Sequence, residues 1–253
     1  MSGAARNERR RRQEAAKAPS VGRIPGSGAG KDNRVKVGIT VAVVLVVVIA
    51  AVFLVVSKPW ASSESVAASY PVTADGVVVT AGQANAPVTV DVYEDYLCPY
   101  CERFETRSAD DITAALNQGK IKVNYHALNI LDAGTKPAGY STLAANAALC
   151  AVPANIWPAF HAKLFAEQPA EGSAGMTAEQ LTKIGTDLGA GPDFGTCVAA
   201  NSNAAGISAA SDTASANPAL QTDGQFGTPT VAVGGQKIDV SSTDWLSQVL
   251  GGS

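Results

Sequence analysis

An uninterrupted apolar stretch, VGITVAVVLVVVIAAVFLVV at residues 37–56, constrains this chain more than any other feature. It contains twenty residues and no charged side chain. A helix of that length spans roughly 30 Å, which matches the hydrocarbon core of a bilayer. We therefore predict that residues 37–56 form a single transmembrane helix in contact with lipid. A cleaved signal peptide is the competing interpretation, but its apolar region is normally only about 7–15 residues long.

Charge is divided unevenly on the two sides of this stretch. Residues 1–36 carry ten Lys or Arg and three acidic side chains, a net charge of +7. Since the whole chain carries −3, the remainder carries −10. Basic segments beside a membrane helix stay on the cytoplasmic side. We therefore expect a disordered cytoplasmic tail at residues 1–36, a tether at 57–75, and an extracytoplasmic domain at 76–253 of a single-pass protein of the cell membrane.

The pattern beyond residue 76 predicts an α/β fold with an all-helical insertion at about residues 137–215. Strands are expected at 76–80, 86–95, 121–131, 228–235 and 236–240, and helices at 97–120, 139–152, 156–168, 177–189, 192–214 and 242–250. The first helix contains a capping-box pattern at Ser108, which predicts a break or kink there. Thr177 and Gln180 predict a capped helix start, and Gly234-Gly235 predicts a hairpin between the last two strands.

The motif Cys98-Pro99-Tyr100-Cys101 lies where a predicted strand hands over to a helix. With Cys98 as the N-cap, Pro99 takes the first helical position, where its missing N–H costs nothing. The free N–H groups of Tyr100 and Cys101 and the helix dipole then favour a Cys98 thiolate. A thiolate of low pKa attacks disulfides and also leaves them readily. We expect Cys98 to be the attacking sulfur and Cys101 the more buried, resolving thiol.

Other interpretations of these cysteines lead to different chemistry. A purely structural disulfide is one, and half of a zinc site is another. Zinc would need a second closely spaced pair of ligands, whereas Cys150 and Cys197 lie 47 residues apart, so we expect no metal and no cofactor. Glu94 precedes the motif together with Asp95, and poorly solvated carboxylates near the sulfur would raise its pKa.

Three segments together resemble the DsbA-like branch of the thioredoxin superfamily: VDVYEDYLCPYC at 90–101, WPAFHAKLFAEQP at 157–169 and GTPTV at 227–231. The resemblance covers roughly residues 76–253. It implies a thioredoxin-like fold with a helical insertion. It also implies a cis Pro229 packed against the cysteine pair, and a Thr228 whose backbone pairs with an extended substrate segment. Without the resemblance, a trans proline at the start of an edge strand is the simpler interpretation.

Two positions depart from the pattern of that family. Val92 stands where thioredoxin and the enterobacterial DsbA have a buried acid, so a proton acceptor for Cys101 is not carried over. Tyr100 stands where the strongest oxidants have histidine. Asp95, by contrast, falls where many relatives have an acid just ahead of the motif.

The remaining cysteines, histidines and tryptophans receive structural interpretations. We interpret Cys150 and Cys197 as a structural disulfide between two helices; an internal electron-relay pair is the alternative. Both His126 and His161 are expected to be packed or solvated rather than catalytic. Trp60 is expected at the membrane interface, and Trp157 and Trp245 are expected in the core.

These patterns predict a thiol–disulfide oxidoreductase that forms disulfides in reduced or misoxidised exported proteins. It would be reoxidised by a quinone-linked membrane partner. A reductase or isomerase of the same fold is the first alternative. The second is an extracytoplasmic peptide-binding or chaperone module that captures extended segments at Thr228 and Pro229 and has only structural cysteines. Nucleic acid is not an expected ligand.

Overall fold

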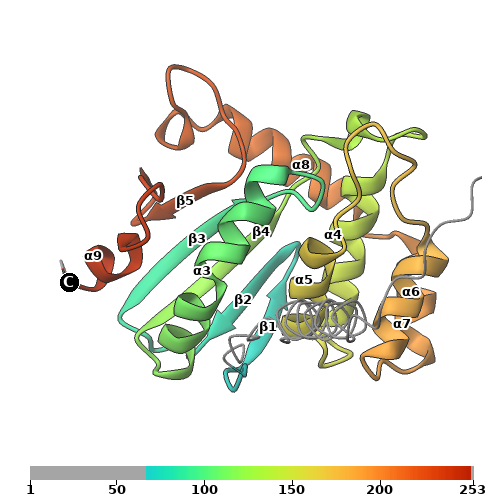
Figure 1. Ribbon diagram of the computed structural model, residues 1–253, viewed down its shortest axis with the longest axis horizontal. Coiled ribbons are helices and arrows are strands. Elements are labelled where there is room, and N and C mark those ends of the chain that lie inside the picture. Colours follow the sequence, from blue (N-terminus) through green and yellow to red (C-terminus); the bar gives the residue numbers. More distant parts are fainter. Residues whose placement is uncertain (1–66, 252–253) are drawn as a thin grey trace, which may run out of the picture. The chain divides into compact units, whose positions relative to one another are not determined.

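The computed structural model describes residues 67–251, shown in colour in Figure 1. The predicted tail, the predicted transmembrane segment and Trp60 lie outside the described residues. Between residues 67 and 251, no helix is both long and apolar enough to cross a membrane. The predictions for residues 1–66 therefore stay predictions.

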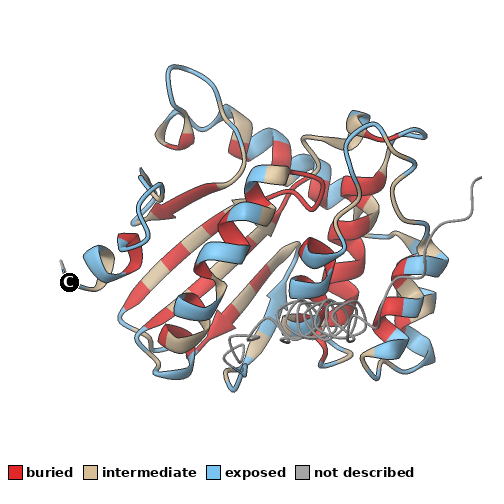
Figure 2. Ribbon diagram, viewed as in Figure 1, coloured by how far each residue is buried: buried red, intermediate tan, exposed pale blue. Residues whose placement is uncertain are grey.

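A six-stranded sheet with the order β1-β2-β4-β3-β5-β6 forms the centre of the domain. Strands β3 and β4 run parallel, and every other neighbouring pair runs antiparallel. Along β3 and β4 buried and half-buried residues alternate, as Figure 2 shows. The strands span Val72–Asp75 (β1), Val78–Gly82 (β2), Val88–Glu94 (β3), Ile121–Ala127 (β4), Thr230–Val233 (β5) and Gln236–Ile238 (β6).

Two strand boundaries differ from the sequence-based expectation. Strand β1 lies inside the segment expected to be a tether, and it pairs with β2 across a turn at Gly76. Its side chains are mostly exposed, so its sequence lacks the alternation of apolar and polar residues that predicts a strand. Strand β4 ends at Ala127 instead of residue 131, because its parallel partner β3 ends at Glu94.

Helices α3 (Pro99–Asn117) and α9 (Trp245–Gly251) pack against each other. The Trp245 ring lies 5.9 Å from the Phe104 ring, and its indole N–H donates to Ser108 Oγ at 3.3 Å. The predicted break near Ser108 is wrong, since α3 runs through it without interruption. The buried Ser108 hydroxyl accepts a tertiary hydrogen bond and does not cap a helix start.

Five helices form the insertion between β4 and β5; in Figure 1 the first four lie to the right of the sheet and α8 lies above it. They are α4 (Tyr140–Ala151), α5 (Trp157–Ala166), α6 (Ala178–Asp187), α7 (Pro192–Ala200) and α8 (Ala204–Ala216), with short 3-10 turns η2 (Asp132–Gly134) and η3 (Pro218–Leu220) at the two ends. Strand β4 leads into η2, and η3 leads back towards β5.

The sequence predicted most of these helix boundaries. The capping box of Thr177 and Gln180 is confirmed at the start of α6. The single helix expected at 192–214 is wrong: it is divided into α7 and α8 at Asn201, whose φ of 45° ends the first helix. Asparagine tolerates this left-handed conformation better than most residues. The hairpin at Gly234 and Gly235 is confirmed.

A disulfide between Cys150 of α4 and Cys197 of α7 joins two helices of the insertion, with the Cα atoms 5.9 Å apart. Cys150 is 2% exposed, in the same core as Phe194 of α7 and Leu181 of α6. The bond therefore joins α4 to α7, which are also held together by hydrogen bonds from the Asn146 side-chain amide to the carbonyl oxygens of Cys197 at 3.4 Å and Val198 at 3.3 Å.

Removal of this bond should lower the free energy of unfolding by about 2–4 kcal/mol, because it closes a long loop in the unfolded chain. The Cys150→Ala/Cys197→Ala double variant tests this by its midpoint in urea. Cys98→Ser/Cys101→Ser keeps the bond and serves as the control. Equal midpoints of the alanine variant and the wild type would show that the bond does not stabilise the fold.

Candidate active site at the start of helix α3

Cys98 is the N-cap residue of α3, and Pro99 is the first residue inside the helix. The Cys98 carbonyl oxygen accepts hydrogen bonds from the backbone N–H groups of Cys101 at 3.0 Å and Glu102 at 3.2 Å. The turn from β3 is closed by a bond from the Cys98 N–H to the Asp95 carbonyl oxygen at 2.9 Å. Parallel pairing with β4 and the short turn after Glu94 therefore place the motif at the end of β3.

The late Thr228-Pro229 segment lies directly against this helix start. Cys98 Sγ lies 3.2 Å from the Thr228 carbonyl oxygen, across 130 residues of sequence. The Thr228–Pro229 peptide bond is cis. Pairing of Tyr93 with Thr230 in the β3–β5 ladder brings the two segments together. The structure thus joins the four motif residues and the Thr228-Pro229 pair in one place.

Both motif sulfurs are free thiols here, and both are buried. Cys98 is 4% exposed and Cys101 is 1% exposed. The family resemblance implied that Cys98 would be the exposed sulfur of the pair, but Cys98 is buried as well, and Cys101 is only slightly more so. The Thr228 segment covers Cys98 from one side, so a partner sulfur must approach beside that segment.

The pKa of Cys98 is lowered to about 6, chiefly because the Cys101 thiol donates a hydrogen bond to the Cys98 sulfur. Burial opposes this effect, while the Thr228 side chain and the N–H groups of Cys101 and Tyr100 reinforce it. The sequence predicted the direction, but it assigned the main cause to the helix-start amides. The Cys98 side chain in fact makes no capping hydrogen bond.

Cys101 shows the opposite behaviour. Burial raises its pKa well above the ordinary value, and the Cys98 sulfur raises it further. The two thiols therefore divide into an acidic sulfur at the helix start and a protonated sulfur one turn behind it.

Asp95 is fully buried beside the motif and accepts three hydrogen bonds. Its Oδ1 accepts from the Leu97 N–H at 2.9 Å and from Ser141 Oγ at 2.7 Å, and its Oδ2 accepts from the Leu131 N–H at 2.9 Å. Burial nevertheless raises its pKa to about 6, and repulsion from Cys98 contributes. The poorly solvated acid that the sequence indicated is present at this position.

Two contributions from the insertion were not predicted from the sequence. The Gln168 side-chain amide donates to the carbonyl oxygens of Tyr96 at 3.0 Å and Cys98 at 3.1 Å, so it holds the turn before α3. His161 of α5 was expected to be packed or solvated. It is packed, but it also contacts Glu94 and Glu105. Within residues 67–251, these three side chains are the one group of three potential metal ligands that lie close together. His161 belongs to the segment 157–169 that resembles the family, but the resemblance did not indicate that its side chain contacts Glu94 and Glu105.

His126 lies on another surface of the sheet and takes no part in this site. Its Nε2 is 3.0 Å from Asp91 Oδ1, and its ring stacks on Tyr93 with the centroids 4.3 Å apart. His126 was expected to be packed or solvated, and the structure shows it half-buried between these two neighbours.

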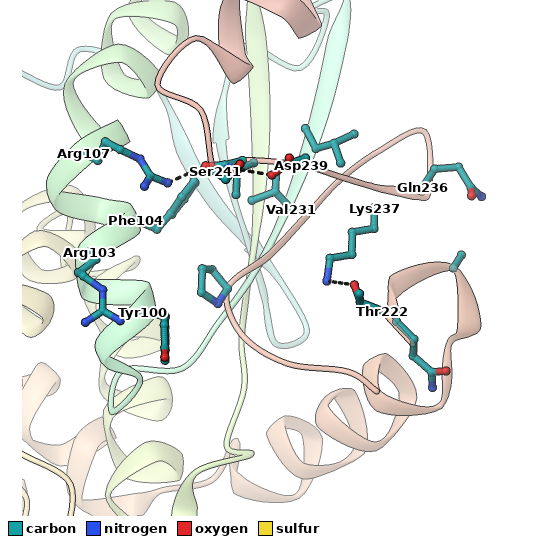
Figure 3. Close-up of a pocket in the computed structure, with 15 residues that line it drawn as sticks. Tyr100, Arg103, Phe104, Arg107, Thr222, Val231, Gln236, Lys237, Asp239 and Ser241 are labelled. Atoms are coloured by element: carbon teal, nitrogen blue, oxygen red, sulfur yellow. Dashed lines mark hydrogen bonds between the residues drawn. The ribbon is translucent and has the colours of Figure 1, made fainter. Parts of the chain in front are cut away.

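A groove of about 750 Å³ opens beside Pro229, between α3 and the β5–β6 hairpin (Figure 3). Tyr100 is 65% exposed at its rim, and the Arg103 guanidinium lies 4.2 Å from the Tyr100 ring centroid. Arg107 and Lys237 add two more basic side chains to the lining. The groove offers an exposed aromatic ring and positive charge next to the motif.

Comparison with known proteins agrees with this architecture. The structure of MdbA, a thiol-disulfide oxidoreductase from Corynebacterium matruchotii, is similar with a TM-score of 0.62 and 26% identity, over 73% of this chain and 93% of that one. The reduced disulfide bond oxidoreductase DsbG from Mycobacterium tuberculosis gives a TM-score of 0.59 and 26% identity, over 70% and 86% of the two chains.

A curated relative is a much longer protein. The serine/threonine-protein kinase PknE of Mycobacterium tuberculosis is 30% identical over 183 residues, which cover 70% of this chain and 32% of the kinase. The present chain thus spans about a third of the length of the curated relatives it matches.

The family expected from the three sequence segments is confirmed. The family model described as Thioredoxin matches residues 74–250, which include both motif cysteines and the cis proline. The chain therefore belongs to the thioredoxin family.

Proposed function

We propose that this chain is a thiol–disulfide oxidoreductase that forms disulfides in exported proteins, with Cys98 and Cys101 as its redox pair. One observation carries the proposal: a sulfur with a pKa of about 6 lies 3.2 Å from the Thr228 carbonyl oxygen and receives a hydrogen bond from a second, protonated thiol. The 26% identical structures of MdbA and DsbG, both oxidoreductases by name, support the same activity.

The reaction starts from the Cys98–Cys101 disulfide. A substrate thiolate attacks Cys98 Sγ, a mixed disulfide forms, and Cys101 leaves with the electron pair of the broken S–S bond. A second substrate thiolate then attacks the substrate sulfur of the mixed disulfide and releases Cys98 as a thiolate. Two electrons pass from the substrate to the cysteine pair, and the substrate gains one disulfide.

Charge at the site favours the oxidising direction. A stabilised Cys98 thiolate stabilises the reduced form of the pair, which makes the disulfide form a stronger oxidant. The buried Asp95 acts in the opposite sense, since its negative charge repels the thiolate. This repulsion is the one observation that favours the alternative, a reductase or isomerase. A measured reduction potential of the cysteine pair distinguishes an oxidase from a reductase.

Thr228 and Pro229 are the proposed substrate-binding residues. An extended segment of substrate would pair with the backbone ahead of β5. Its neighbouring side chains would then lie in the groove along Tyr100 and Arg103. Pro99 supports the motif by starting α3.

The proposed location is the outer side of the cell membrane, with residues 37–56 as an uncleaved anchor. The basic residues 1–36 support a cytoplasmic N-terminus. A quinone-linked membrane protein would then return the cysteine pair to its disulfide form, and the Cys150–Cys197 bond would have only a structural role.

Activity should depend on both motif cysteines and on neither of the other two. Reduced, unfolded substrate should gain disulfides with the wild type and with Cys150→Ala/Cys197→Ala. Cys98→Ser should show no activity above background, because this variant cannot form the Cys98–Cys101 disulfide that the substrate thiolate attacks. Equal activity of Cys98→Ser would overturn the proposal and would leave a binding or chaperone module.

The Cys98 thiolate should titrate with a midpoint of about 6 in the reduced wild type, followed by thiolate absorbance. The thiolate is present above that pH and is lost as the pH falls through it. Cys101→Ala should shift the midpoint upward, because it removes the largest stabilising hydrogen bond. A midpoint unchanged by Cys101→Ala would show that this bond does not control the pKa of Cys98.

Asp95→Asn should make the pair more oxidising by roughly 10–30 mV, where 30 mV corresponds to about 1.4 kcal/mol for two electrons. The reason is loss of a buried negative charge close to Cys98. Asp91→Asn is the matched control, since Asp91 lies on β3, the strand that ends just before Asp95, and contacts His126. Equilibration with glutathione measures both; a wild-type potential near about −120 mV would support the oxidase, and one near about −270 mV the reductase.

A further inference from the structure

Two buried carboxylates and one imidazole lie behind Cys101. Glu94 is the last residue of β3, His161 belongs to α5, and Glu105 follows Cys101 by four residues on α3. His161 Nε2 lies 2.9 Å from Glu94 Oε1, and His161 Nδ1 lies 4.0 Å from Glu105 Oε2. One imidazole ring therefore lies between two carboxylates, with one ring nitrogen towards each.

Burial differs along this row of groups. The Glu94 side chain is 1% exposed, His161 is 6% exposed and Glu105 is 10% exposed. Glu94 acts electrostatically on Cys101 and is among the causes that raise the pKa of that thiol. The row thus leads from the neighbourhood of the resolving sulfur towards the surface at Glu105.

The surroundings of the three groups are largely aromatic. Rings that lie 4.6 to 5.8 Å from the imidazole centroid belong to Tyr96, Tyr125, Trp157 and Phe165. Glu94 Oε2 and Glu105 Oε1 are buried and make no hydrogen bond. Buried charges without partners are costly, so this site favours a state in which a proton is held between the two carboxylates.

Titration of the cluster agrees with this state. Burial raises the pKa of Glu105 to about 7, against the opposing effect of His161. Burial disfavours the charged imidazole, but Glu94 and Glu105 outweigh that effect and raise the pKa of His161. The other titratable groups that face the cluster are Tyr70, Tyr96, Tyr125 and Cys101.

The acid beside Cys98 is not a comparable proton acceptor. The Asp95 carboxylate already accepts three hydrogen bonds, from Leu97, Leu131 and Ser141. Val92, further back on β3, is apolar. Among the carboxylates near the motif, Glu94 and Glu105 are the ones with an unoccupied buried oxygen.

We propose that Glu94, His161 and Glu105 form a buried proton store for Cys101. The inference rests on the proposed function, because it assigns the proton that the Cys101 sulfur gains and loses. The three residues act through Cys101 and do not touch the substrate, so they are positioning residues for this proton.

The proton balance follows the exchange reaction. When a substrate thiolate attacks Cys98, Cys101 leaves as a thiolate and takes one proton from the store. When Cys101 later attacks a disulfide, it returns that proton as its sulfur forms the new S–S bond. The store therefore holds the proton while the Cys98–Cys101 disulfide is present and lacks it while Cys101 is a thiol.

The first test is the pH dependence of exchange between the oxidised full chain and dithiothreitol. The wild-type rate, corrected for thiolate of the reagent, should change with a midpoint near pH 7. Glu105→Gln should remove this inflection and slow the reaction at least about tenfold below pH 7, where the store holds its proton. The Cys98 titration near pH 6 should be unchanged in this variant.

Matched controls come from the His126–Asp91 pair, a second imidazole–carboxylate contact of 3.0 Å away from the motif. His126→Gln and Asp91→Asn should keep the wild-type inflection, and His161→Gln should lose it. An inflection that persists in folded Glu105→Gln, or that disappears equally in the controls, overturns the proposal.

A second measurement does not depend on folding of the buried variants. Infrared difference spectra of the wild type between the disulfide and the chemically reduced dithiol should show a change in a protonated carboxyl band. Specific labelling of glutamate with carbon-13 shifts that band if it belongs to the cluster. A spectrum without any glutamate change on reduction overturns the proposal.

Two further outcomes are informative. One equivalent of tightly bound metal, lost in His161→Gln but kept in His126→Gln, would overturn the proton store in favour of a metal centre. No exchange with dithiothreitol would count against the proposed function. The infrared experiment uses a strong chemical reductant, so it tests the proton store independently of the exchange reaction with dithiothreitol.

Discussion

The hydrogen bonds accepted by Asp95 hold the active-site turn to the rest of the domain. Its carboxylate connects the turn before α3 with the start of η2 and with α4 of the insertion, through Leu97, Leu131 and Ser141. Three separate segments therefore meet at one buried group. The β3–β4 ladder holds β4 next to the turn, and the bonds to Asp95 add η2 and α4.

The insertion is part of the site as well as an addition to the sheet. It supplies Ser141 to Asp95, Gln168 to the backbone of the turn, and His161 to the carboxylates behind Cys101. The Cys150–Cys197 bond lies within the same layer, between α4 and α7. Stability of the helical layer and geometry of the redox site are therefore coupled, because α4 takes part in both.

Sequence reasoning predicted the parts of the site that are local or belong to a family motif. Cys98 and Pro99 were placed at a helix start because their chemistry depends on neighbours in sequence. The partners of His161 were not predicted, since Glu94 and Glu105 meet it only through packing of β3, α3 and α5. Strand β1 was missed because its exposed side chains show no alternation. The break at Asn201 was missed because the alanine-rich segments on both sides of residues 201–203 are strong helix formers.

Two pKa shifts of opposite direction make the stability of the reduced site depend on pH. The pKa of Cys98 is lowered to about 6, so its contribution to stability exists above the value in the unfolded chain and is lost as the pH falls through about 6. The pKa of Asp95 is raised to about 6, so its contribution exists below the unfolded value and is lost as the pH rises through about 6. At neutral pH the thiolate is therefore stabilised against a buried like charge, and the strength of the hydrogen bond from Cys101 decides how oxidising the pair is.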